Sequence, residues 1–168
     1  MWLKIKNISS QESQIIKIIT DGSASPKHRV GAWASCIVVS SDKLILKDTE
    51  ENTSQHAMEL KAVISSLKYI QSAFQNVSSL EVHTDSDYVL NLVKRRKRLT
   101  ENNFKTSKGK EVRNQDLIRQ FYRWLDHFNV ILMKVEGHAK KGLSEITDYH
   151  REVDKLSRRL VREKTRNL

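Results

Sequence analysis

A run of apolar, mostly β-branched residues ends abruptly in an acidic residue at Ile15-Ile16-Lys17-Ile18-Ile19-Thr20-Asp21-Gly22-Ser23. Such a run predicts a buried strand. A carboxylate at the end of a buried strand must be solvated, paired or bound to a metal, because a lone buried charge is too costly. Taken alone, Asp21-Gly22 is also typical of a hairpin turn.

A near-copy of this ending occurs further along the chain, at Leu80-Glu81-Val82-His83-Thr84-Asp85-Ser86. Two strands that both end in Thr-Asp suggest that two carboxylates converge at one edge of a sheet. We therefore interpret Asp21 and Asp85 as parts of one site rather than as two turns.

The residues that follow the first strand predict an antiparallel meander. We expect a turn that begins at Gly22 and contains the only proline, Pro26, and a hairpin loop at Ser40-Ser41-Asp42-Lys43. Strands are expected at residues 15–21, 31–39 and 44–47. Their close spacing favours antiparallel pairing.

The apolar period then changes to that of a helix over Leu60, Val63, Ile64, Leu67 and Ile70. We expect Thr53 or Ser54 as the N-cap and Glu59 in the first turn. The remaining elements are expected as a strand at 80–84, a short helix at 86–93, an amphipathic helix at 117–128, a strand at 130–135 and a closing helix whose apolar stripe is Tyr149, Val153, Leu156 and Leu160.

Crossover helices follow strands three and four, and such connections require that the strands added after them pair in parallel. The sequence thus predicts an α/β fold: a five-stranded mixed sheet, with strands 1–3 antiparallel and strands 1, 4 and 5 parallel, and helices on both faces. With 168 residues, the chain suits one domain, at 15–166, preceded by an N-terminal arm at 1–14.

Composition narrows the class of protein. Thirty Lys and Arg against twenty Asp and Glu give a formal charge of +10, which favours a polyanionic partner. The sequence has no apolar run near the ~18 residues of a membrane span and no secretory signal, and its one cysteine, Cys36, lies in an apolar run. We expect a cytoplasmic monomer that does not bind membranes, with Cys36 in the core.

Four acidic residues lie next to apolar runs or stripes, where a purely structural role for a carboxylate is least favourable: Asp21, Glu59, Asp85 and Asp154. Individually, Glu59 can be a helix-dipole partner and Asp154 a solvated helix-face charge. Four clustered carboxylates, however, repel one another unless a cation is present. Oxygen ligands without Cys or paired His select Mg²⁺ or Mn²⁺, and two such ions suit phosphoryl transfer.

Several short motifs, in order along the chain, resemble those of ribonuclease H type 1. They are Thr20-Asp21-Gly22-Ser23, Met58-Glu59-Leu60, Thr84-Asp85-Ser86-x-Tyr88-Val89, Gly137-His138-Ala139 and Val153-Asp154-Lys155-Leu156. The resemblance runs from about Ile15 to Arg162. The fold of that family has the element order predicted above.

The resemblance implies an endoribonuclease that hydrolyses the RNA strand of RNA–DNA hybrids with two Mg²⁺ ions, for which Mn²⁺ can substitute, and leaves 5′-phosphate and 3′-hydroxyl ends. Asp21 would bridge both ions, and Asp154 would complete the site that activates water. Glu59 and Asp85 would complete the site near the leaving 3′-oxygen. His138 would assist proton transfer or product release.

The same resemblance implies a nucleic-acid surface with a basic protrusion at about 94–113. Ser54 and Asn114 would bind a DNA-strand phosphate, and Phe104 would pack on a sugar. The other substrate contacts implied are Gly22, Ser23, Gln55 and His56 in the minor groove, and Arg95, Arg96, Lys105 and Thr106 on the protrusion. Without the resemblance, the basic tract is equally well explained as a solvated charge run.

The chain departs from the family pattern in three places. Asp87 occupies a position that often carries glutamine, and the interval from His138 to Asp154 is longer than in typical bacterial enzymes, as in retroviral RNase H domains. His150 stands one helical turn before Asp154, where asparagine is common.

Two other functions remain open at this stage. A non-catalytic module that binds hybrids or double-stranded RNA would need only the basic protrusion. A DNA-cutting transposase or integrase relative would also use an acidic triad. The position of Glu59 on the first helix and the Gly-His-Ala loop disfavour the latter.

Overall fold

The computed structural model describes residues 15–75, 77, 79–136 and 142–166. The elements in order are β1 (Ile15–Ser25), β2 (Val30–Val39), β3 (Asp42–Glu51), α1 (Gln55–Ala73), β4 (Ser79–Thr84), α2 (Asp87–Glu101), α3 (Gln115–His127), β5 (Val130–Lys134) and α4 (Glu145–Arg166). The strands form one sheet in the order β3-β2-β1-β4-β5. β1 pairs with β2, and β2 with β3, antiparallel, whereas β4 is parallel to β1 and to β5. The predicted mixed sheet is confirmed.

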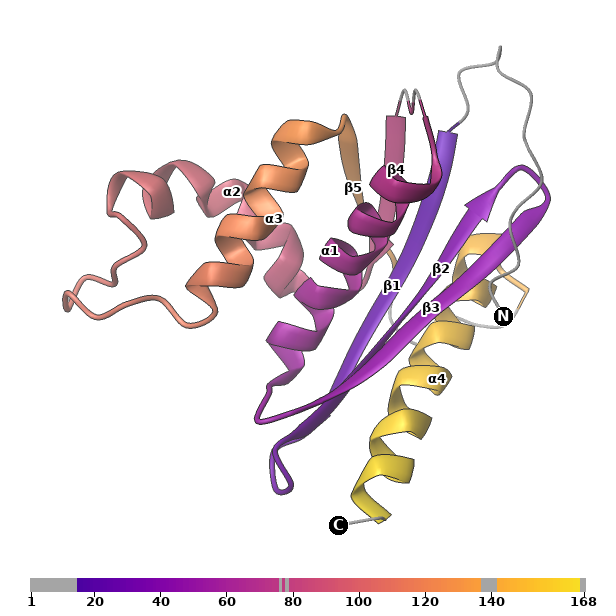
Figure 1. Cartoon of the computed structure of the whole chain (residues 1–168), viewed down its shortest axis with the longest axis horizontal. Helices are drawn as coiled ribbons and strands as arrows, with labels where there is room; N and C mark the ends of the chain where they lie inside the picture. Colours follow the sequence, from indigo (N-terminus) through magenta and orange to yellow (C-terminus); the bar gives the residue numbers. More distant parts are fainter. Residues whose placement is uncertain (1–14, 76, 78, 137–141, 167–168) are drawn as a thin grey trace.

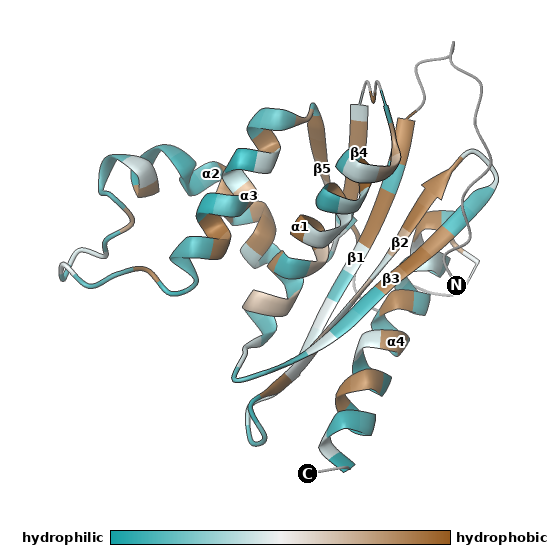
Figure 2. Ribbon diagram, viewed as in Figure 1, coloured by the Kyte–Doolittle hydropathy of each residue, from teal (hydrophilic) through white to brown (hydrophobic). Residues whose placement is uncertain are grey.

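Helices cover both faces of the sheet, as predicted (Figure 1). α4 packs on one face of β1 and β2, and α1 packs on the other, with α3 against α1. Side chains alternate along β1: Ile16 and Ile18 join the large core under α1, while Ile19 joins a smaller core with Val153 of α4. Figure 2 shows apolar residues along much of the strands and on several turns of the helices.

β1 is longer than the sequence pattern suggested, and Asp21-Gly22 is not a turn. Pairing with β2 continues past Asp21 to Ser25, which lies opposite Val30. The turn lies at 26–29. The prediction placed the turn too early because local Gly and Ser signals were outweighed by cross-strand pairing. β3 extends to Glu51 for the same reason, opposite β2.

α2 is also longer than predicted. It runs through Glu101, so the basic tract forms the second half of the helix. Leu92 and Leu99 are buried on its inner face, which explains why the helix continues through the charged residues. Figure 1 shows α2 and the segment 102–114 projecting away from the sheet. The predicted N-terminal arm lies outside the described residues.

α1 begins after Ser54, whose hydroxyl accepts a hydrogen bond from the Ala57 amide at 3.3 Å. Ser54 is therefore the N-cap, and Glu59 lies in the second turn rather than in the first. The first turn of α1 contains no acidic residue. This placement weakens the explanation of Glu59 as a helix-dipole partner, since the dipole acts mainly on the first turn.

Cys36 is fully buried in the core on the α4 side of the sheet. Within the described part of the chain, no helix has both the length and the apolar character needed to span a bilayer.

Candidate active site

Sheet register places two of the predicted carboxylates side by side. Thr20 of β1 lies opposite Thr84 of β4 in the parallel pairing, so Asp21 and Asp85 follow directly at neighbouring positions. Asp21 lies on the α4 side of the sheet, because it follows Ile19 by two residues. There its carboxylate accepts a hydrogen bond from the hydroxyl of Ser157 on α4.

A glycine brings the third carboxylate to this edge. A Cβ built on Gly22 would lie 2.3 Å from the Glu59 backbone nitrogen and 2.6 Å from the Met58 carbonyl carbon. Only glycine allows β1 and α1 to approach so closely. The close neighbour of Gly22 on this side is therefore the backbone of α1, so packing alone requires a glycine at this position.

Two side chains hold Glu59 in place. The Ser86 hydroxyl donates to Glu59 Oε2 at 2.5 Å, and Gln55 Nε2 donates to Oε1 at 3.1 Å. The fourth carboxylate, Asp154, is on α4 and pairs with Arg158 one turn later, with Nε 2.8 Å from Oδ1.

All four carboxylates line one cleft of about 460 Å³. Its lining is Asp21, Gly22, Ser23, Gln55, His56, Glu59, Asp85, Ser86, Asp87, Tyr88, Asp154 and Arg158. The carboxylates come from four separate elements or their ends. The four predicted minor-groove residues, Gly22, Ser23, Gln55 and His56, line the same cleft.

Electrostatics of the cleft favour a bound cation. Burial raises the pKa of Asp21 to about 7. The negative charges of Asp85 and Asp154 raise it further, whereas the hydrogen bond from Ser157 lowers it. Burial also raises the pKa of Glu59 despite hydrogen bonds from Ser86 and Gln55. Carboxylates with raised pKa values are poorly compensated charges, and a divalent ion would supply the missing positive charge. The donor set, which is mainly oxygen, fits Mg²⁺ or Mn²⁺.

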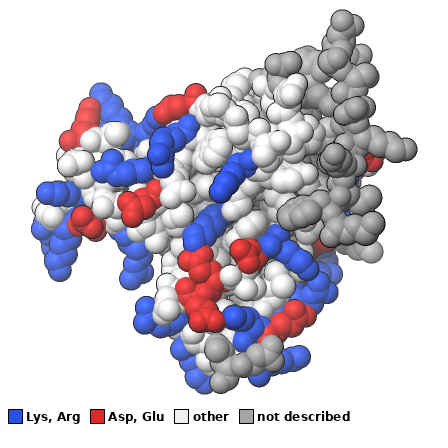
Figure 3. Space-filling view, viewed as in Figure 1, with Lys and Arg blue, Asp and Glu red and all other residues white. Residues whose placement is uncertain are grey.

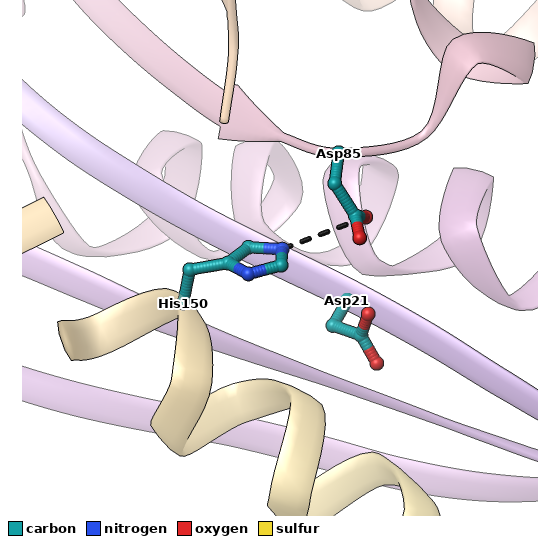
Figure 4. A group of neighbouring side chains, drawn as sticks. All are labelled: Asp21, Asp85 and His150. Carbon is teal, nitrogen blue, oxygen red and sulfur yellow. Dashed lines mark ion pairs between the residues drawn. The ribbon is translucent and has the colours of Figure 1, made fainter. Parts of the chain in front are cut away.

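His150 is a member of the site that sequence reasoning did not include among the site residues. Its Nε2 lies 3.5 Å from Asp85 Oδ1, and ligand atoms of Asp21, Asp85 and His150 all lie within 4.8 Å of one another. Figure 4 shows the ring projecting from α4 toward the two aspartates. Burial alone would lower the pKa of His150, but the interaction with Asp85 and the charges of Asp21 and Asp154 raise it. The available signal was its spacing of one helical turn before Asp154.

A second group lies at the edge of the cleft. The rings of His56 and Tyr88 stack with centroids 4.3 Å apart and planes 6° apart. Burial raises the pKa of Tyr88, while a hydrogen bond with the Asn114 side chain and the charge of Arg95 lower it. The structure therefore brings Arg95 and Asn114 together with Tyr88. Ser54, the N-cap of α1, directly precedes Gln55 and His56 in the chain.

Asp87 has a basic partner. Lys134 of β5 donates to Asp87 Oδ1 at 2.5 Å. This pair offsets the charge that Asp87 adds to the cleft.

Phe104 does not present a face to a substrate, contrary to prediction. Its side chain is 3% exposed and belongs to the large core, and the Arg119 guanidinium lies 3.9 Å from its ring centroid. The aromatic ring is occupied because the segment after α2 folds back onto α3. This long-range packing leaves no local signal.

The other predicted contacts on the protrusion differ in availability. Lys105 and Thr106 are exposed. Arg96 already donates to Asp126 Oδ2 at 2.6 Å and lies over the Tyr122 ring. Figure 3 shows Lys and Arg, with interspersed Asp and Glu, over the protruding part of the molecule. The predicted His138 lies outside the described residues.

Comparison with known proteins gives the family. The model of the RNase H family matches residues 13–162. A Ribonuclease H of Caldicellulosiruptor saccharolyticus is 36% identical over 79% of this chain and 90% of its own length. A Ribonuclease H of a Thermoanaerobacter species is 31% identical over 94% of this chain and 96% of its own.

Two solved structures share the fold at lower identity. LC9-RNase H1, described as a type 1 RNase H with the type 2 active-site motif, has a TM-score of 0.73 at 16% identity, covering 91% of this chain and 74% of that one. A foamy viral protease-reverse transcriptase in complex with dsDNA has a TM-score of 0.65 at 15% identity, covering 87% and 92%. The sheet order, the family match and the related sequences agree: the chain belongs to the RNase H family.

Proposed function

We propose that this protein is an endoribonuclease that hydrolyses the RNA strand of RNA–DNA hybrids. The observation that carries the proposal is the convergence of Asp21, Glu59, Asp85 and Asp154 in one cleft. A protein that only binds nucleic acid has no need for four mutually repelling carboxylates. The relatives named Ribonuclease H support the reaction class.

The carboxylates would hold two Mg²⁺ ions, or Mn²⁺ in their place. Asp21 would help to hold both ions, Asp154 would help to hold the ion that activates water, and Glu59 and Asp85 would help to hold the ion that stabilises the leaving oxygen. When bound, such ions generate a nucleophile from water and stabilise the leaving oxygen, which would give 5′-phosphate and 3′-hydroxyl ends.

Neighbouring side chains would keep these ligands in position. Ser157 and Ser86 donate to Asp21 and Glu59, which restricts each carboxylate to one orientation. Arg158 holds Asp154 at the rim of the cleft. Ligands held by a second layer of hydrogen bonds lose less entropy when a metal binds. His138 would assist proton transfer or product release.

Recognition of the hybrid would use both sides of the cleft. Ser23, Gln55 and His56 would contact the minor groove, where RNA displays its 2′-hydroxyls. Ser54, Arg95 and Asn114 would take a phosphate of the DNA strand beside Tyr88. Lys105 and Thr106 would add phosphate contacts on the protrusion, and Arg96 would do so only by giving up Asp126.

A panel of substrates tests this function. Strand-labelled RNA–DNA hybrid, RNA duplex and DNA duplex are incubated with the protein in Mg²⁺ and, as control, in EDTA. We expect cutting of the RNA strand of the hybrid alone, and only with metal. Binding of the hybrid without cutting would contradict the proposal and favour a binding module. Cutting of the DNA duplex would favour a relative of transposases.

We also propose that the protein acts as a monomer in the cytoplasm. Sedimentation at concentrations near those of the activity assay would test the first part. A stable dimer would contradict it.

A further inference from the structure

His150 is a buried nitrogen donor that the proposed catalytic roles do not use. It lies on α4 with 3% of its surface exposed. Its Nε2 makes no good hydrogen bond within the described part of the chain, and its nearest partner is Asp85 Oδ1, with which it forms an ion pair at 3.5 Å. A buried nitrogen held only by one long ion pair is poorly satisfied, which calls for an explanation.

The ring is aimed into the carboxylate cluster. Figure 4 shows the imidazole projecting from α4 with Nε2 turned toward Asp85, and Asp21 close by. A donor atom of each of these three residues lies within 4.8 Å of the others. Adjacent ligands of one octahedral ion with bonds of about 2.1 Å lie about 3 Å apart, and opposite ligands about 4.2 Å apart. The separation of 3.5 Å between Nε2 and Oδ1 falls between these values.

His150 borders a second hollow beside the main cleft. This hollow of about 220 Å³ is lined by Asp85, His150, Arg151, Asp154 and Lys155. Asp85 and His150 are therefore neighbours at this hollow, and Asp85 also lines the main cleft.

We propose that His150 Nε2 is a ligand of the ion held by Asp21 and Asp85, and that this nitrogen shifts the preference of the site from Mg²⁺ toward first-row transition ions. Mg²⁺ prefers oxygen donors, whereas imidazole suits transition ions. The inference rests on the proposed function insofar as it assumes that a divalent ion binds at Asp21. It adds a mixed nitrogen–oxygen coordination that the four carboxylates alone would not give.

Mn²⁺ is the probe that tests this ligand directly, since its electron spin senses directly bonded nitrogen. The substrate-free protein is loaded with Mn²⁺ and examined by pulsed electron paramagnetic resonance for ¹⁴N modulation. We expect an imidazole ¹⁴N signal in the unaltered chain and its loss in His150→Asn. In the control His28→Asn, an exposed histidine in the turn after β1 is changed, and the signal should remain.

Metal affinity gives a second readout. His150→Asn should weaken Mn²⁺ binding on the order of tenfold. Removal of a residue that only supports a metal ligand already lowers metal affinity by about this factor. Its Mg²⁺ affinity should stay near that of the unaltered chain. Thermal unfolding of the metal-free variant verifies that it folds.

The outcomes separate the two proposals. Suppose that Mn²⁺ binds to the unaltered chain, that Asp21→Asn abolishes this binding, and that the bound ion shows no ¹⁴N modulation. This result would overturn the role of His150 and leave the proposed function standing. Equal loss of Mn²⁺ and Mg²⁺ affinity in a folded His150→Asn would also overturn the nitrogen preference. Failure of the unaltered chain to bind either ion would overturn both proposals.

Discussion

At the scale of single residues, Asp21 carries the most unfavourable environment in the cleft. Its pKa is raised from 3.8 to about 7, chiefly by burial. The folded state therefore binds more protons than the unfolded state between about pH 4 and 7. Without metal, stability should fall as pH rises through this window, by at most about 4 kcal/mol from this residue.

Asp21→Asn should flatten this pH dependence. Denaturant unfolding in EDTA at pH values from 4.5 to 8 measures it, with Asp42→Asn, an exposed aspartate at the start of β3, as the matched control. At pH 8 the Asp21→Asn variant should be more stable than the unaltered chain, because no buried charge has to form. If the unfolding free energies of Asp21→Asn and the unaltered chain changed in parallel with pH, burial of the Asp21 charge would not be the cause of the pH dependence.

Gly22 offers a second prediction at this scale. Gly22→Ala would place a Cβ 2.3 Å from the Glu59 nitrogen, so β1 and α1 must move apart. We expect a loss of about 1–3 kcal/mol in unfolding free energy, together with weaker metal binding because Glu59 moves with its backbone. Ala24→Gly, in the same strand, is a comparison that adds no atoms. Unchanged stability in Gly22→Ala would show that the helix can shift freely.

The residues also show where sequence reasoning succeeds and fails. Asp21 and Asp85 were predictable because each follows an apolar, β-branched run, and the strand register then places them together. His150 was seen only as a departure, since its nearness to Asp85 depends on how α4 crosses the sheet. Phe104 was misjudged because its burial depends on a segment that folds onto α3.

At the scale of elements, strand and helix types were predictable but their ends were not. β1 extends beyond Asp21 because β2 pairs with it, and α2 continues through Lys94–Arg98 because its inner residues are buried. Both extensions come from tertiary contacts that outweigh local propensity. The second extension matters for function, because it places the basic residues on one rigid helix that leads into the 102–114 segment.

This protruding segment should contribute to hybrid affinity through charge. Lys105 is exposed there, so Lys105→Ala should weaken hybrid binding and reduce the slope of log affinity against log salt by about 1. Lys68→Ala, an exposed lysine on the second half of α1, is the matched control and should leave the slope unchanged. Fluorescence anisotropy in EDTA measures binding without cutting. Equal slopes for both variants would mean that the protrusion is merely solvated.

At the scale of the whole molecule, the sheet is a scaffold that gathers residues distant in sequence. The predicted topology was correct because crossover helices restrict strand order more strongly than local propensities restrict element ends. The cleft draws on the middle of β1, the residues that directly follow β4, the second turn of α1 and the middle of α4. Its chemistry therefore exists only in the assembled fold, although each motif is short.

The assembled set of carboxylates is proposed to cut the RNA strand of a hybrid. Single-turnover cleavage of an end-labelled RNA strand, annealed to DNA, tests it with the unaltered chain, Asp21→Asn and the control Asp42→Asn in Mg²⁺. We expect RNA fragments with 3′-hydroxyl ends from the unaltered chain and from Asp42→Asn, and intact RNA with Asp21→Asn. Undiminished cleavage by a folded Asp21→Asn would contradict a catalytic role for this carboxylate cluster.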